Sequence, residues 1–237
     1  MIIYNSLDKE NRMNNPSKGN QPKINIGDSW YKLDFLGYEG ASEFVTSELL
    51  KHSNVKSFVE YRIEDVEYND SSKKACISRN FLKEGQEIVT VEQMFKKLLG
   101  KPSSFVFKDM SVKDRIKYTV DFVEKSTGLN NFGEYLTTLL ELDAIILNED
   151  RHLHNIAVIE NSDGSFSYCP IFDNGAAFFS DMNQDYPLSK TFGRCLKSVK
   201  AKPFSSSFDK QAKEAESLYG EQLEFEKGFT LPEDVIT

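Results

Sequence analysis

"NEDRHLHN", residues 148–155, decides the fold, because it follows directly on the apolar run "LLELDAIIL" at 139–147. A run that is apolar nearly all round predicts a buried, central helix. The segment after it carries the acid or base candidates Asp150, His152 and His154, together with Arg151 and Asn155. A polar cluster at the end of a buried helix indicates a loop that is fixed in place for chemistry.

A second polar segment, "PIFDNG" at 170–175, follows at the far end of a predicted β-hairpin. The strand candidates "NIAVIE" (155–160) and "FSYCPIF" (166–172) flank the turn signal "NSDG". We expect the hairpin to bring Asn155 and Asp173 side by side. In phosphoryl transfer one carboxylate orients the attacking hydroxyl, while an amide oxygen and a second carboxylate hold Mg²⁺. The order Asp150, Asn155, Asp173 fits these roles.

Each of these residues also has a simpler interpretation. An Asp or Asn after a long helix commonly caps it or forms a turn. His152 and His154 could be a zinc pair, but side chains at i and i+2 of a strand point apart, and no cysteine lies near them. We therefore expect His152 to support the catalytic carboxylate rather than to bind a metal.

Composition excludes several classes of function. Acidic residues outnumber basic residues by 37 to 29, a formal net charge of −8, so nucleic acid is not an expected partner. The sequence contains neither a membrane-span-length apolar run nor a signal-peptide pattern at its N-terminus, so we expect no membrane partner and a cytoplasmic location. The cysteines lack CxxC spacing and are expected to be buried or free thiols.

The order of predicted elements indicates an α+β protein with two lobes. A β-rich lobe is expected at residues 1–85 and a mainly helical lobe at 86–237, with "FLKEGQEIVT" (81–90) as the crossing and a cleft between them. Residues 14–27 are predicted to form a flexible loop. The expected strands are 28–36, 57–68 and 73–82, and the expected helices are 40–53, 90–99, 111–126, 132–147 and 207–220.

"NEDRHLHNIAV" followed by "PIFDNG" resembles the HipA-like serine/threonine kinases, and within them the shorter cell-translocating kinase branch. The string "DRHxxNI" with a later "FDxG" is also similar to phosphatidylinositol kinases, which belong to the same kinase-like superfamily. The resemblance implies an atypical two-lobed protein-kinase fold, with a β-rich N-lobe and a helical C-lobe that carries a catalytic hairpin. It also implies ATP and Mg²⁺ as cofactors.

Carried over residue by residue, the resemblance implies Asp150 as catalytic base, aided by His152, and Asn155 and Asp173 as metal ligands. The family's strand lysine corresponds to Lys32 in "WYKLD". Its partner acid in the following helix corresponds to Glu43, with Glu48 as the alternative.

"SKGNQPK" at 17–23 resembles the family's phosphate-covering loop, which gives nucleotide-binding roles to Ser17, Gly19, Gln21 and Lys23. Without the resemblance, one glycine is weak evidence for such a loop, and these residues indicate only a flexible segment. Ser17 is the candidate for regulatory autophosphorylation. "SRNFL" (78–82) matches the interlobe hinge, with Arg79 and Phe81 beside the adenine.

The predicted function is an ATP- and Mg²⁺-dependent kinase that phosphorylates Ser or Thr of a protein, including its own chain. Arg151 stands where many HipA-like proteins have Gly, which keeps open a kinase acting on a small molecule or lipid headgroup. A nucleotide-binding pseudokinase is a further alternative, and a metal-dependent phosphohydrolase using Asp150, His152 and His154 is another. Fewer than twenty residues precede the expected phosphate-covering loop, so we expect the family's N-terminal antitoxin-contacting subdomain to be missing, and a HipB-type partner is not implied. From "TLPEDVIT" (230–237) we expect a C-terminal helix to be missing as well.

Overall fold

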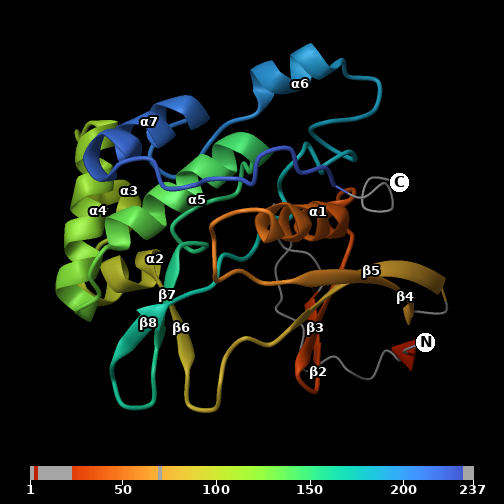
Figure 1. The fold of residues 1–237 in the computed structure, drawn as a ribbon, viewed down its shortest axis with the longest axis horizontal. Coiled ribbons are helices and arrows are strands. Elements are labelled where there is room, and N and C mark those ends of the chain that lie inside the picture. Colours follow the sequence, from red (N-terminus) through yellow and green to blue (C-terminus); the bar gives the residue numbers. More distant parts are fainter. Residues whose placement is uncertain (1–2, 5–22, 69–70, 232–237) are drawn as a thin grey trace. The chain divides into compact units, whose positions relative to one another are not determined.

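The computed structural model describes residues 3–4, 23–68 and 71–231, which fall into two compact units (Figure 1). Unit 1 contains the described residues through Phe81, the segment Phe172–Val199 and the described residues from Phe225 onward. Unit 2 contains Leu82–Ile171 and Lys200–Glu224. Neither unit is one continuous stretch of sequence, because the chain returns to unit 1 after the hairpin and to unit 2 at Lys200.

Unit 1 is built on a five-stranded sheet in the order β1-β4-β5-β3-β2, with helix α1 along one face (Figure 1). Alternation along β3 places Tyr31 and Leu33 in a core with residues of the neighbouring strands. Lys32 therefore points to the opposite face, toward α1. The elements of this unit are β1 (Ile3–Tyr4), β2 (Lys23–Ile26), β3 (Ser29–Leu33), α1 (Glu39–Lys51), β4 (Tyr61–Tyr68), β5 (Ser71–Arg79) and α6 (Phe192–Ser198).

Strand β2 corrects the prediction of a flexible loop over the whole of 14–27. Lys23–Ile26 pairs antiparallel with β3, so that Ile26 faces Ser29 across the turn at Gly27. Gly27 has φ +56°, a conformation that glycine adopts without strain. Many Asn, Pro and Gly residues precede Lys23, and they indicate a loop more strongly than the four alternating residues "KINI" indicate a strand.

Unit 2 combines a three-stranded sheet, β6-β7-β8, with several helices (Figure 1). The predicted hairpin is confirmed as β7 and β8, in which Val158 faces Tyr168. Strand β6 was not predicted; it occupies part of the expected crossing segment. The elements are β6 (Glu87–Thr90), α2 (Val91–Met94) continued by a π-helical segment (Phe95–Leu99), α3 (Ser103–Val106), α4 (Val112–Thr127), α5 (Phe132–Ile146), β7 (Ala157–Glu160), β8 (Phe166–Tyr168) and α7 (Phe208–Tyr219).

Helix α5 is the buried helix that the opening stretch predicted. It packs against α4 and α7, and its leucines at 136, 139, 140 and 142 are fully buried. The helix ends at Ile146 and is capped by Leu147, which has φ +56°. The backbone N–H of Asn148 donates to the carbonyl oxygen of Asp143 at 3.2 Å. This turn starts the loop that carries Asp150. Among the helices in the described ranges, none is both long and apolar enough to cross a membrane.

Candidate functional site

A buried ion pair joins β3 to α1 in unit 1. The Lys32 ammonium donates to Oε1 of Glu43, and the two residues are 7% and 0% exposed. The same ammonium lies 3.4 Å from the Tyr61 hydroxyl and 5.1 Å from the centre of that ring. The alternative partner, Glu48, instead pairs with Lys51 at 2.6 Å. The Lys32–Glu43 contact is present as expected, and its role in nucleotide binding stays a prediction.

Opposing electrostatic effects act on Lys32. Burial by itself lowers the pKa of the ammonium, because it penalises the charged form. The negative charges of Glu43 and Asp173 and the Tyr61 oxygen outweigh this effect and hold the pKa well above its usual value. Lys32 is therefore a permanently charged cation at neutral pH, held by its neighbours inside unit 1.

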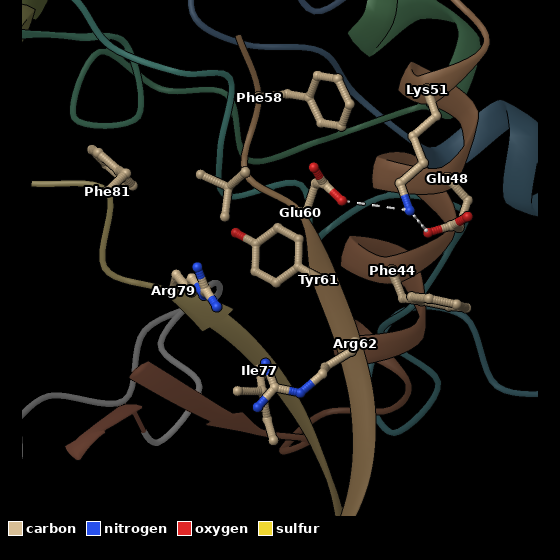
Figure 2. Close-up of a pocket in the computed structure, with 11 residues that line it drawn as sticks. Phe44, Glu48, Lys51, Phe58, Glu60, Tyr61, Arg62, Ile77, Arg79 and Phe81 are labelled. Atoms are coloured by element: carbon tan, nitrogen blue, oxygen red, sulfur yellow. Dashed lines mark hydrogen bonds and ion pairs between the residues drawn. The ribbon is translucent and has the colours of Figure 1, made fainter. Parts of the chain in front are cut away.

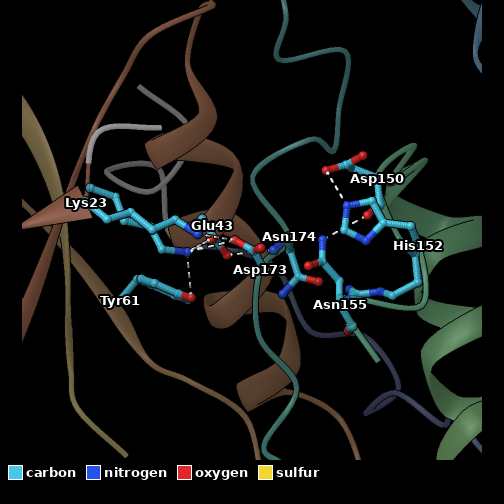
Figure 3. Close-up of polar contacts among 10 residues, drawn as sticks. Lys23, Glu43, Tyr61, Asp150, His152, Asn155, Asp173 and Asn174 are labelled. Carbon is cyan, nitrogen blue, oxygen red and sulfur yellow. Dashed lines mark hydrogen bonds and ion pairs between the residues drawn. The ribbon is translucent and has the colours of Figure 1, made fainter. Parts of the chain in front are cut away.

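Asp173 reaches the same cation from the segment that follows the hairpin. Its Oδ1 lies 3.1 Å from the Lys32 ammonium and 3.4 Å from that of Lys23 (Figure 3). Lys23 and Lys32 are opposite each other in the β2–β3 pairing, so both side chains leave the same face of the sheet. The backbone N–H of Asn174 donates to Oε2 of Glu43 at 2.8 Å. Glu43 thereby fixes both Lys32 and the backbone beside Asp173.

The segment after Asp173 is fastened to the start of α1. The backbone N–H of Tyr38 donates to the backbone carbonyl oxygen of Ser180 at 3.2 Å. The Ser42 hydroxyl donates to the backbone carbonyl oxygen of Ala177 at 3.1 Å. Gly37 is required at this approach, because a Cβ there would lie 1.8 Å from the Ser180 oxygen. These contacts give Asp173, which has φ +59°, a defined position relative to the ion pair.

The expected phosphate-covering loop is described only at its last residue. Ser17, Gly19 and Gln21 lie outside the described residues. Lys23 begins β2 and contacts Asp173, as given above. The autophosphorylation expected at Ser17 stays a prediction.

The expected hinge residues line a cavity of about 610 Å³ in unit 1 (Figure 2). Arg79, at the end of β5, and Phe81 contribute to its wall together with Tyr61, which also contacts Lys32. The Phe81 ring lies 5.9 Å from that of Phe172. The backbone N–H of Asn80 donates to the oxygen of Asp28 at 2.7 Å, so this group is already engaged within the chain.

In unit 2, hydrogen bonds within the loop 148–155 hold Asp150 (Figure 3). The Asp150 backbone N–H donates to Oδ1 of Asn148 at 3.2 Å, and the amide nitrogen of Asn155 donates to the Asp150 carbonyl oxygen at 2.9 Å. The carboxylate Oδ1 lies 3.0 Å from the ammonium of Lys202, and Oδ2 lies 3.6 Å from Nε2 of His152. Asp150 is thus a positioned carboxylate flanked by a cation and an imidazole.

Arg151 explains why this loop keeps its shape. Its guanidinium is fully buried and donates to both carboxylate oxygens of Asp143, the closest contact being 3.1 Å. It also donates to the carbonyl oxygen of Asn155 at 3.2 Å. Burial raises the pKa of Asp143, while the charge and hydrogen bonds of Arg151 and a hydrogen bond from Asn148 oppose this rise. Arg151 therefore ties the loop to α5 and does not face the solvent.

The two histidines after Asp150 form an edge-on pair, with ring centres 5.2 Å apart. Burial, followed by the charge of His152, lowers the pKa of His154. Within the described ranges, no group of at least three His, Cys, Asp or Glu side chains is arranged to hold a metal ion. Asn155 lies in unit 2 and Asp173 in unit 1, so their sharing of one Mg²⁺ stays a prediction.

A comparison with solved structures identifies the fold. A crystal structure of a Helicobacter pylori proinflammatory kinase, CtkA, matches with a TM-score of 0.52 and 18% sequence identity over 73% of this chain. The fold is kinase-like. The match spans 59% of the CtkA chain. No protein-family model and no curated protein sequence matches this chain. The predicted α+β kinase-like fold is confirmed, and membership of the HipA-like family stays a prediction.

Several residues of these clusters were not found from the sequence. Tyr61 reaches Lys32 through folding alone, and no local pattern marks it. Asn174 belongs to the quoted segment "PIFDNG", but its backbone contact with Glu43 was not predicted. Lys202 lies 52 positions from Asp150 along the chain, so its contact depends on tertiary structure. Asp143 did carry a signal, because a carboxylate inside an apolar helix must find a partner when it is buried.

Proposed function

We propose that this protein is a Mg²⁺-dependent kinase that transfers the γ-phosphate of ATP to Ser or Thr of a protein, its own chain included. The observation that carries the proposal is the buried cation Lys32, held by Glu43 and Asp173 in a chain with a kinase-like fold. A buried ionisable group whose pKa is strongly shifted by burial and by specific charged partners is a candidate for a functional site.

The charges in unit 1 suit a nucleotide phosphate. Lys32 and Lys23 provide positive charges that contact one carboxylate oxygen of Asp173. A strand lysine that reaches the phosphates needs a carboxylate to keep it in place, and Glu43 is in contact with Lys32. In the proposal both lysines bind phosphate oxygens, and Glu43 keeps Lys32 extended toward them.

The proposed metal ligands, Asp173 and Asn155, have the chemistry that Mg²⁺ prefers. Carboxylate and amide oxygens are hard ligands, and Mg²⁺ in nucleotide sites is commonly held by one or two protein groups plus phosphates. The amide nitrogen of Asn155 is used in its bond to Asp150, which leaves the amide oxygen as its ligand atom. When bound, Mg²⁺ would supply positive charge to neutralise the phosphate groups.

Asp150 is the proposed base. The acceptor hydroxyl oxygen forms a bond to the γ-phosphorus while the bond from phosphorus to the β–γ bridging oxygen breaks, and ADP leaves with that electron pair. The hydroxyl proton passes to the Asp150 carboxylate, which Lys202 and His152 hold in position from either oxygen. His152 acts in the proposal as a positioning residue.

Arg151 bears on the class of acceptor. This residue gives the motif its similarity to the lipid kinases, but its side chain is buried against Asp143. The departure from Gly therefore has a structural explanation inside unit 2 and carries no information about a lipid headgroup. We accordingly propose a protein acceptor.

Intact-protein mass after incubation with Mg²⁺ and ATP tests the proposal. Wild type should gain the mass of one or more phosphates, and Asp173→Asn should gain none while retaining its fold by circular dichroism. Asp65→Asn is the matched control, because this aspartate is exposed and pairs only with the exposed Lys74 among the ion pairs of the described chain. An unchanged gain in Asp173→Asn would refute the assignment of Asp173.

If wild type gains no phosphate mass, a measurement of nucleotide binding distinguishes the two possible reasons. If ATP with Mg²⁺ raises the thermal midpoint but no protein or peptide acceptor is phosphorylated, the chain is a nucleotide-binding module and the transfer is refuted. If ATP with Mg²⁺ leaves the midpoint of wild type unchanged, both the kinase and the binding module are excluded.

A further inference from the structure

A second cavity, of about 520 Å³, lies in unit 2 and includes two of the residues that contact Asp150. Lys202 and His152 line it, and these are the same side chains that lie 3.0 and 3.6 Å from the two oxygens of the Asp150 carboxylate. The cavity and the proposed base therefore share a wall. A group bound in the cavity would lie close to any hydroxyl that Asp150 holds.

The cavity is predominantly positive. Besides Lys202, it is lined by Lys108 and Arg115, and neither of these two forms an ion pair with a carboxylate in the part of the chain that the structure describes. His154 adds a ring that can donate or accept a hydrogen bond. The cavity thus offers cations whose charge is not cancelled locally.

The one acid on the wall, Glu92, is compensated by its own neighbours. Its carboxylate is buried, accepts the backbone N–H of Ser103 at 3.3 Å and lies 3.5 Å from the ammonium of Lys96. Burial by itself raises the pKa of Glu92, but the hydrogen bonds from Ser103 and the charge of Lys96 outweigh this effect and lower it. The carboxylate is therefore ionised and has its own partners. It does not neutralise Lys108 or Arg115.

Arg115 and the backbone of Lys202 are held in place before any ligand binds. Arg115 donates to the carbonyl oxygens of Met110 and Phe204 at 3.1 and 3.2 Å. The backbone oxygen of Lys202 accepts from the fully buried side chain of Gln211 at 3.0 Å. A preorganised site loses less free energy on binding, because its side chains are already ordered.

We propose that this cavity binds a phosphate or carboxylate group of the acceptor polypeptide, on a residue near the Ser or Thr that is phosphorylated. The inference rests on the proposed function, because it uses Asp150 as the site of the acceptor hydroxyl. An extended chain advances about 3.3 Å per residue. Because the cavity shares a wall with Asp150, we expect the anionic residue to lie roughly one to three positions from the Ser or Thr that is phosphorylated. The cavity selects acceptors whose flanking sequence is acidic or already phosphorylated.

Direct binding of labelled peptides tests the cavity without any turnover. The probes are nine-residue peptides with a central Ser, flanked on either side by phosphoserine, by Glu or by Gln, and the readout is fluorescence anisotropy in the absence of ATP. We expect the phosphoserine and Glu peptides to bind wild type on the order of tenfold more tightly than the Gln peptide. Equal affinities would refute the proposal.

Variants locate the site. Lys108→Gln, at an exposed position, and Arg115→Gln should each reduce the preference for the charged peptides several-fold, and the double variant should remove it. Lys113→Gln is the matched control, since Lys113 is exposed on the same helix as Arg115 and does not line the cavity. A double variant with an intact fold that keeps the preference would place the binding elsewhere and refute the proposal.

Turnover and competition complete the test. The ratio of kcat/KM between Glu and Gln peptides should exceed one in wild type and fall in Lys108→Gln. If both peptides are phosphorylated equally and bind equally, the cavity is refuted while the kinase stands; if charged peptides bind but none is phosphorylated, the kinase fails and the polypeptide site stands. Displacement of the peptide by inorganic phosphate or by phosphoinositide vesicles at lower concentrations than by unlabelled peptide would refute a polypeptide ligand.

Discussion

Arg151→Met should destabilise the protein by about 3–5 kcal/mol, because it leaves the Asp143 carboxylate buried without its cation. Both residues of the pair are 0% exposed, so water does not replace the lost partner. The guanidinium makes hydrogen bonds to both oxygens of Asp143 and to the carbonyl oxygen of Asn155, and Met makes none of them. For a chain of 237 residues this corresponds to a fall of roughly 6–20 °C in the thermal midpoint.

The destabilisation should depend on pH, and the sign follows from Asp143. Burial raises the pKa of its carboxyl, and Arg151 opposes the rise, so the variant has the higher folded-state pKa. When the folded state raises the pKa of an acid, the protonated acid stabilises the folded state at pH values below its unfolded pKa. This stabilisation is lost as the pH increases through the folded-state pKa. The gap between wild type and Arg151→Met should therefore be small near pH 4 and increase toward neutral pH.

Thermal and urea denaturation at several pH values measure this gap. The double variant Arg151→Met/Asp143→Leu should recover most of the stability, since it removes the uncompensated charge. Arg62→Met is the exposed comparison: its pair with Glu64 is largely in solvent and should contribute at most about 1 kcal/mol. A loss below about 1 kcal/mol in Arg151→Met, or a loss independent of pH, would refute the reasoning.

Three further predictions concern unit 1 and the hairpin. Glu43→Gln should lower kcat/KM for ATP on the order of tenfold or more in steady-state assays, because it removes one partner of a buried charged pair; Glu48→Gln should not. Gly37→Ala should destabilise by about 1–3 kcal/mol in thermal denaturation, since its Cβ would lie 1.8 Å from a facing carbonyl oxygen, whereas Gly193→Ala has open space. Burial raises the pKa of Cys169 to about 12, so a thiol reagent at pH 8 should modify it only after unfolding.

Much of the fold could be predicted because its elements carry strong local signals. The apolar run of α5 and the "NSDG" turn identified the central helix and the hairpin without any tertiary information. Strand β2 was missed because four residues of alternation follow a stretch rich in Asn and Pro. Strand β6 was missed for a different reason: its backbone pairs with β7, which lies about 70 residues later, and local sequence does not encode that partner.

The candidate site also combines residues that local sequence marks with residues that only tertiary contacts reveal. Motif order predicted Asp150, Asn155 and Asp173 as site residues, and their roles stay predictions. The resemblance predicted Lys32 and Glu43, whose contact is present. The sequence could not reveal Lys202 beside Asp150, because the contact depends on how the segment before α7 packs. It also led us to consider Arg151 as a clue to the acceptor, whereas burial against Asp143 accounts for it.

The pairing of Lys23 with Lys32 across β2 and β3 has a consequence for how the sheet responds to ligands. Like charges directly opposite each other repel and weaken a strand pair, and here Asp173 is the counterion in contact with both. A phosphate bound by these lysines would replace the Asp173 carboxylate as their counterion, and the carboxylate would be released. Negative charge beside these lysines therefore helps to hold the first residue of β2 against β3, and neutralising Asp173 should weaken this pair locally as well as impair binding.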